Sequence, residues 1–166
     1  MILGMSFSTF TTVHVVISLI GVVTGIVVLF GMLNGRRLEG LTAVFLATTV
    51  LTSVTGFLFP FSTLLPSHVV GIISLVVLVI ALVALYSKRL SGAWRSIYIV
   101  TATVALYLNV FVGVVQAFQK VAFLQPLAPT QAEAPFVIAQ VIVLALFAVL
   151  GFLAVRRFHP QIGMPA

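Results

Sequence analysis

The feature that most constrains this chain is a series of five long apolar stretches with basic residues in alternate gaps. Seven of the eight Lys and Arg residues follow the first, third and fifth stretches, and they are Arg36, Arg37, Lys88, Arg89, Arg95, Arg156 and Arg157. The gap after the fourth stretch has only Lys120, and the others have none. Cytoplasmic loops of membrane proteins are enriched in Lys and Arg. The pattern predicts a multi-pass membrane protein with its N-terminus outside and its C-terminus in the cytoplasm.

Composition agrees with a lipid environment. Hydrophobic residues make up 62% of the 166 residues and charged residues 6%, whereas soluble domains have about 25% charged residues. The formal net charge is +6, but the basic residues sit at the ends of apolar stretches and form no continuous basic face, so we expect no nucleic-acid partner. Anionic lipid headgroups account for the same charges. The expected partner is therefore the lipid bilayer.

We expect residues 1–166 to form a single transmembrane domain, an all-α bundle of five helices. The helices are predicted at 10–33, 41–61, 67–87, 93–118 and 136–155. Each has about 20 residues or more, which at ~1.5 Å per residue crosses a hydrocarbon core of ~30 Å. Many stretches are rich in Val and Ile, but runs this long exclude the short alternating strands of a barrel. Asn34-Gly35 and Ser91-Gly92 are typical of chain turns and are expected to end the first helix and precede the fourth.

Small and polar residues fall into rows on the first two helices. On the first helix the row contains His14, Ser18, Gly21 and Gly25, and its two glycines form a GxxxG pattern that lets another helix approach closely. On the second helix, Thr48, Thr52 and Thr55 form one row, and Thr49, Ser53 and Gly56 form the next. The favoured interpretation of these rows is helix packing.

The fourth helix has a more polar face, on which Asn109, Gln116 and Lys120 follow one another at helical spacing. Asn109 lies near mid-membrane, where an amide without partners costs several kcal/mol. The face is therefore expected either to dock against the threonine rows, which we favour, or to line a polar cavity open to the outside. Gln140, near the outer end of the fifth helix, and His14 are expected to join it. The leading functional hypothesis is that this outer-half face binds a small lipophilic ligand or a partner membrane protein.

Two histidines are the best candidates for cofactor chemistry. His14 in the first helix and His68 at the start of the third are expected at similar depth near the outer surface. Two neutral imidazoles from different helices can ligate a b-type haem or a metal. Electron transfer through a haem held by His14 and His68 is therefore the alternative hypothesis, beside the favoured interpretation that both are structural or interfacial. A third hypothesis is a small-solute transporter or channel, which would need a homo-oligomer because five helices are too few to enclose a wide pore.

Several enzyme classes are excluded by composition. The chain has no cysteine, so it cannot build thiol catalysis, Cys-based zinc sites or iron–sulfur ligation. Its two acids are Glu39, expected to pair with Arg36 or Arg37, and Glu133, expected near Lys120. With no Asp and no further Glu, neither a Ser–His–Asp triad nor a paired-carboxylate site is expected. We therefore expect a protein without enzymatic activity and predict no dedicated metal site.

Three segments carry a resemblance to a known group of proteins. The strings TTVLTSVTGFLFPF (48–61), LYLNVFVGVVQAFQK (106–120) and LAPTQAEAPF (127–136) resemble a family of small bacterial multi-pass membrane proteins. The resemblance covers nearly the whole chain and implies a location in the inner (plasma) membrane, and it brings no activity with it. The tryptophan-rich sensory family also has five helices, but its many interfacial tryptophans are missing here, where Trp94 is the single one.

Overall fold

The structure is a computed structural model that describes residues 2–60 and 66–160, and these residues are helical without a strand. The long helices are α1 (Phe7–Leu33), α2 (Glu39–Gly56), α3 (Pro66–Leu82), α4 (Trp94–Lys120) and α5 (Ala134–Arg157). A π-helical turn, η1 (Val83–Ser87), continues α3, and a 3-10 helix, η2 (Gln125–Leu127), lies in the link between α4 and α5. All five helices, with η1 counted as part of α3, are long and apolar enough to cross a membrane. The prediction of five apolar helices is confirmed.

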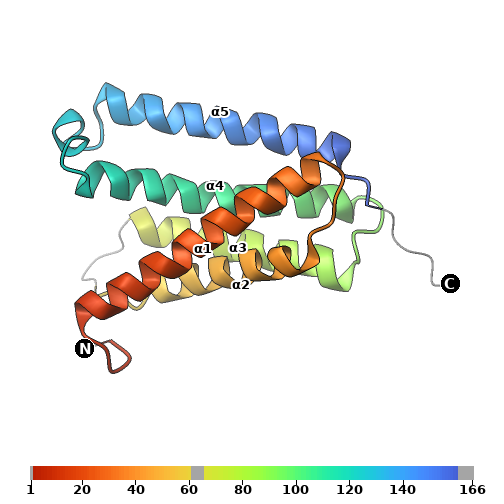
Figure 1. Cartoon of the computed structure of the whole chain (residues 1–166), viewed down its shortest axis with the longest axis horizontal. Coiled ribbons are helices and arrows are strands. Elements are labelled where there is room, and N and C mark those ends of the chain that lie inside the picture. The colour runs from red at the N-terminus through yellow and green to blue at the C-terminus, as the bar shows by residue number, and fades with distance from the viewer. Residues whose placement is uncertain (1, 61–65, 161–166) are drawn as a thin grey trace.

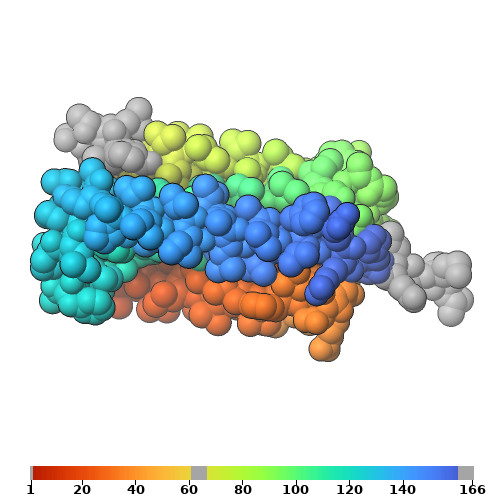
Figure 2. All heavy atoms as spheres, turned by 90° about the horizontal axis from the view of Figure 1, so that it is seen from above, coloured from red at the N-terminus to blue at the C-terminus, as the bar shows by residue number. Residues whose placement is uncertain are grey.

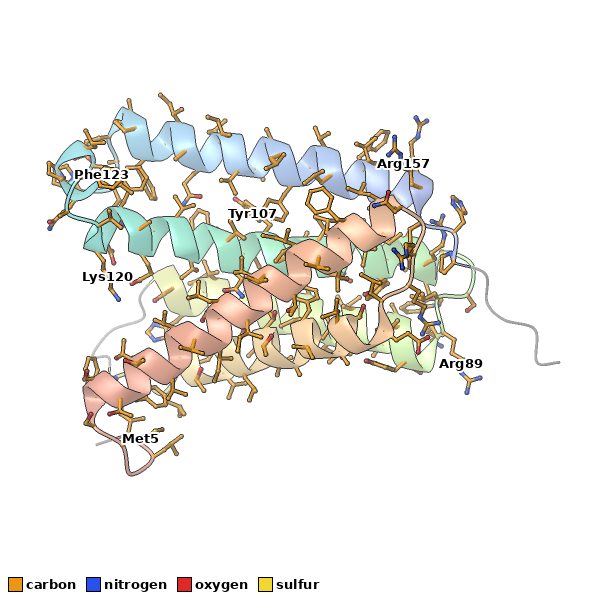
Figure 3. All side chains as sticks on the ribbon, in the orientation of Figure 1. Met5, Arg89, Tyr107, Lys120, Phe123 and Arg157 are labelled. Carbon is orange, nitrogen blue, oxygen red and sulfur yellow. The ribbon has the colours of Figure 1, made fainter. Side chains whose placement is uncertain are left out.

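The helices lie along one long axis, and α1 crosses the others obliquely (Figure 1). One end of the bundle carries the N-terminus and the link between α4 and α5, and we call it the N-terminal end. The other end carries the links from α1 to α2 and from α3 to α4 and the end of α5, and we call it the basic end. Arg89 and Arg157 lie at the basic end and Lys120 lies at the N-terminal end (Figure 3). The alternating pattern of basic residues in the sequence therefore places Lys120 at the N-terminal end and the other Lys and Arg residues at the basic end.

Helix α4 is the centre of the bundle because it contacts each of the other four helices. Its Ile99 and Ala105 are fully buried, as are Leu78 and Ala81 of α3. Helix α5 packs on α4 and on α1, and seen from above it runs over the bundle with α1 on one side and α3 on the other (Figure 2). Small side chains on α4 and α3 allow the close packing of this central pair.

Two glycines bring α1 into close contact with two helices at once. A Cβ atom added at Gly25 would lie 2.6 Å from Leu106 Cδ1 of α4 and 2.8 Å from the Phe45 ring of α2. At Gly21 it would lie 3.1–3.2 Å from polar atoms of the same two helices. A Cβ atom at Gly25 would require its neighbours to shift, and one at Gly21 would be tightly packed, so the GxxxG pattern serves the close approach predicted for it.

Local chemistry explains where the helices begin and end. Helix α1 ends at Asn34-Gly35 as predicted: Gly35 has φ +67°, and the N–H groups of Gly35 and Arg36 donate to the carbonyls of Met32 and Gly31 at 3.0 and 2.8 Å. This is a Schellman motif. The helix begins at Phe7, earlier than the predicted residue 10, because the Ser6 hydroxyl accepts the N–H of Thr9 at 3.1 Å and caps it.

Helix α2 is shorter than predicted. It ends at Gly56, whereas the prediction continued to Phe61, which lies outside the described residues. The N–H groups of Phe57 and Leu58 bond to carbonyls three residues back, at 3.2 and 3.1 Å, and so tighten the last turn. Pro60 disfavours helical geometry at the residue before it. With η1 counted as part of α3, both ends of α3, α4 and α5 differ from prediction by at most two residues.

The basic end is tied together by hydrogen bonds and one ion pair. The Arg95 guanidinium of α4 donates from Nη1 to the carbonyls of Val155 at 2.9 Å and Phe158 at 2.5 Å, where α5 ends. Arg37 pairs with Glu39 at 3.3 Å, as predicted. A cation at a helix C-terminus satisfies free carbonyls and complements the helix dipole. Arg95 therefore fixes the end of α5 against the start of α4.

The surface between the two ends is largely apolar. Side chains with more than half of their surface exposed occur on α1, α3 and α5, for example Val23 (60%), Val79 (59%) and Ile142 (61%). Water-soluble monomers rarely expose contiguous apolar surface on this scale. Hydrocarbon is the solvent that fits it.

Candidate functional site

Asn109 is covered by α1 and faces the threonine rows of α2. A Cβ atom added at Gly21 would lie 3.2 Å from Asn109 Nδ2, 3.1 Å from Thr48 Oγ1 and 3.2 Å from Thr49 Oγ1. The three polar atoms thus converge on Gly21. Thr48 and Thr49 donate their own protons to the carbonyls of Val44 and Phe45, each at 2.7 Å. Asn109 Nδ2 is buried beside them and makes no hydrogen bond among the described residues. Asn109 therefore takes the docked arrangement, which was the favoured alternative.

The remainder of the polar face of α4 is uncovered. Gly113, Gln116 and Lys120 are exposed, and we call these three residues the α4 stripe. A Cβ atom added at Gly113 would meet no atom within 4 Å. Helix α1 crosses α4 obliquely and diverges from it toward the N-terminal end (Figure 1), and the Lys120 side chain points away from α5 (Figure 3). Asn109 and the stripe share one helical face, but packing covers only the first.

Among the described residues, Lys120 has no acidic partner. Glu39 pairs with Arg37 at the basic end. Glu133, expected near Lys120, instead accepts hydrogen bonds from the Thr130 hydroxyl at 2.7 Å and the backbone N–H groups of Thr130 and Ala132 at 3.2 and 3.1 Å. Glu133 precedes α5 directly, so its carboxylate is used by the turn that starts this helix. The Thr130 hydroxyl bond, together with these N–H bonds, lowers the pKa of Glu133 from its ordinary value.

His14 of α1 packs against the end of α2 and the residues that follow it. It is half-buried, and its Nδ1 lies 2.8 Å from Thr55 Oγ1 of α2. Its ring packs edge-on against Phe59, with 5.1 Å between the ring centroids. His14 Nδ1 is therefore engaged with α2.

The structure gives His68 different neighbours from those of His14. His68 is 5% exposed, and its ring lies 5.7 Å from the Phe57 ring. The described residues contain no group of three or more His, Cys, Asp and Glu placed to hold a metal. Of the two histidines considered as haem ligands, His14 thus packs against Phe59 and His68 against Phe57. Both phenylalanines follow the end of α2 in the chain.

Gln140 lies on the other side of α4 from the stripe. Its Nε2 donates to the Phe111 carbonyl at 3.2 Å, and helical spacing places Phe111 nearly opposite Asn109. The structure therefore does not bring Gln140 together with Gln116 and Lys120, and its amide joins α5 to α4. A 3.6-residue period orients residues within one helix but does not say which face of α4 meets α5.

Gln131 is a site residue that the sequence pattern did not reveal. Its Nε2 donates to the Val115 carbonyl at 3.1 Å, one turn beyond the carbonyl that Gln140 uses. This bond holds the link between α4 and α5 against the bundle. Nothing in the local sequence distinguished Gln131 from Gln125 in the same link.

A cavity lies under this link, apart from the α4 stripe. Its volume is about 210 Å³, and Phe118, Gln119, Gln125 and Gln131 are among its lining residues. The lining has amide and hydroxyl groups and no titratable side chain. Such a lining can hydrogen-bond a neutral solute.

Comparison with known proteins gives no match for this chain among family models, curated proteins or solved structures.

Proposed function

We propose that this chain is a non-enzymatic multi-pass membrane protein that binds a small lipophilic ligand on the α4 stripe. In this proposal the N-terminal end faces the outside of a bacterial inner membrane and the basic end faces the cytoplasm. The grouping of basic side chains at one end of the bundle supports the orientation, because cytoplasmic ends are enriched in Lys and Arg.

The observation that carries the binding proposal is the exposure of polar residues at the lipid-facing side of α4. Gln116 is exposed in a spanning helix, and Gly113 beside it has open space above its backbone. An amide without hydrogen-bond partners is costly in hydrocarbon, so a ligand with a polar group gains by bonding to it. Among the described residues, no other helix of the chain covers Gln116 and Gly113, so we propose that another molecule does.

The extent of the stripe favours a small ligand over a partner helix. From Gly113 to Lys120 the stripe spans about 10 Å along the helix axis. Toward the basic end the same face is already covered at Asn109 by α1. A helix–helix contact usually extends along several turns, whereas a small amphiphile fits within two.

The test is extraction of the purified protein followed by mass spectrometry of the lipophilic compounds it retains. We expect Gln116→Leu to reduce the retained ligand, and Gly113→Leu to reduce it as well by filling the open space. Gln119→Leu makes the same change on an exposed residue of α4 outside the stripe, one that lines the cavity under the link. Ligand lost in this variant and retained in the stripe variants would place the ligand in that cavity instead. Equal retention by wild type and both stripe variants would show that the stripe holds no ligand. If no ligand is found but the wild-type protein still captures another membrane protein through the stripe, the occupant is a partner helix instead.

A further inference from the structure

We infer that the ligand of the α4 stripe is an anionic glycerophospholipid, with its phosphate at the Lys120 ammonium and its ester carbonyl at the Gln116 amide. This inference rests on the function proposed above and names the chemical class of the ligand.

Charge is the first argument. Lys120 is exposed at the N-terminal end, and both acidic side chains of the chain are engaged elsewhere, Glu39 with Arg37 and Glu133 with Thr130 and Ala132. An ammonium group at the end of a spanning helix lies at the depth of the lipid headgroups and attracts anionic lipids. The complementary group is therefore an anion supplied by the bilayer.

The order of side chains along α4 is the second argument. Lys120 stands at the last residue of the helix, Gln116 lies about 6 Å deeper, and Gly113 lies almost one further turn toward the membrane centre. A glycerophospholipid has the same order, with phosphate above ester carbonyls above acyl chains. Lys120 donates charge-assisted bonds to phosphate, Gln116 Nε2 donates to a carbonyl, and the open space at Gly113 receives an acyl chain. Each group of the stripe thus faces the lipid group that it can bind.

A single cysteine near the stripe makes the inference testable, because the chain has no cysteine of its own. The label is placed beside the stripe, so that the open space at Gly113 stays free: Val112→Cys, one helical turn deeper than Gln116, is labelled with bimane. The protein is reconstituted in phosphatidylcholine nanodiscs containing either spin-labelled phosphatidylglycerol or spin-labelled phosphatidylcholine. Val141→Cys is the control position, since its distance from the N-terminal end of α5 matches that of Val112 in α4 to within one residue and it is 57% exposed. Quenching at each position measures the local enrichment of the spin-labelled lipid.

We expect phosphatidylglycerol to be enriched over phosphatidylcholine at residue 112 by about fivefold, the ratio that one Lys–anionic lipid contact supplies near a membrane surface. At residue 141 the two lipids should quench equally. Lys120→Gln should abolish the enrichment, and Lys88→Gln, the same change at the basic end, should leave it unchanged.

The outcomes separate this inference from the function on which it rests. Equal quenching by both lipids at residue 112 would overturn the anionic class and leave the stripe open to a neutral lipophilic ligand. Enrichment that survives Lys120→Gln would overturn the role of Lys120. No quenching at residue 112 with full quenching at residue 141 would show a stripe covered by protein, and both proposals would fail.

Discussion

His14 Nδ1 lies 2.8 Å from Thr55 Oγ1, and this contact joins α1 to α2 near the N-terminal end of the bundle. The Thr55 hydroxyl donates its proton to the Leu51 carbonyl at 2.7 Å, so its oxygen is available to the Nδ1–H tautomer of His14. Hydrogen bonds between spanning helices contribute about 0.6 kcal/mol on average and up to ~1.7 kcal/mol. A double-mutant cycle with His14→Phe and Thr55→Val, measured by reversible unfolding in bicelles, should give a coupling energy in this range.

The control for this cycle is Thr12→Val on α1. The Thr12 hydroxyl bonds to the Ser8 carbonyl of its own helix at 3.0 Å, so its coupling to His14→Phe should be close to zero. Coupling of equal size in both cycles would show that the His14–Thr55 bond contributes nothing specific.

Gly25 should not tolerate a methyl group. A Cβ atom there would lie 2.6 Å from Leu106 Cδ1 and 2.8 Å from Phe45, and overpacking of this kind costs about 1–3 kcal/mol. Gly113→Ala is the matched control, because a Cβ atom there meets nothing within 4 Å and both changes gain the same helix propensity. Unfolding should show Gly25→Ala destabilised and Gly113→Ala unchanged or stabilised. Equal stability of the two variants would mean that α1 does not approach α4 and α2 this closely.

Arg95→Gln should loosen the end of α5. It removes the two bonds to the carbonyls of Val155 and Phe158, and bonds from charged groups contribute about 1.5–3 kcal/mol. Hydrogen exchange should accelerate in the last turn of α5 and leave the middle of this helix unchanged. Arg89→Gln, which removes an exposed guanidinium at the same end, should leave the exchange as in wild type.

The carboxylate of Glu133 should titrate with a pKa below the ordinary value of a glutamate, chiefly because the Thr130 hydroxyl donates to it. A depressed pKa in the folded state stabilises the protein above the pKa of the unfolded state, and this contribution is lost as the pH falls through the folded pKa. Thr130→Ala should move the titration midpoint upward. Carbon-13 NMR of labelled glutamate in the Glu39→Gln background observes Glu133 alone, and a midpoint unaffected by Thr130→Ala would contradict the hydrogen bond.

The proposed orientation can be tested with single cysteines in exposed turns. Gln125→Cys lies at the N-terminal end and Ser91→Cys at the basic end. A membrane-impermeant maleimide added to intact cells should label residue 125 and not residue 91, and both should react after permeabilisation. The reverse result would invert the topology.

Much of the helical architecture could be predicted because its causes are local. The stop of α1 at Asn34-Gly35 follows from one residue that adopts a positive φ, and the GxxxG pattern places two glycines on one face. The end of α2 was predicted five residues too late, because apolar residues follow Gly56 and hydropathy does not register the tightened turn that ends this helix.

The candidate site was predictable only in part. Helical spacing correctly places Asn109, Gln116 and Lys120 on one face of α4. It does not encode where α1 crosses that face, and the crossing decides that Asn109 is covered while Gln116 and Lys120 are exposed. In the same way, the position of Gln140 in the chain does not reveal that it bonds to the opposite side of α4.

The sequence alone determined five apolar helices with most basic residues in alternate links. The thickness of the hydrocarbon core sets the length of each helix, and Lys and Arg gather in the links on one side of a membrane. Only the tertiary structure decided which polar groups are covered inside the bundle and which are exposed. That outcome depends on the close approach of α1 to α2 and α4 at Gly21 and Gly25. It also depends on the divergence of α1 from α4 toward the N-terminal end. Close contact buries Asn109, and divergence leaves the α4 stripe exposed.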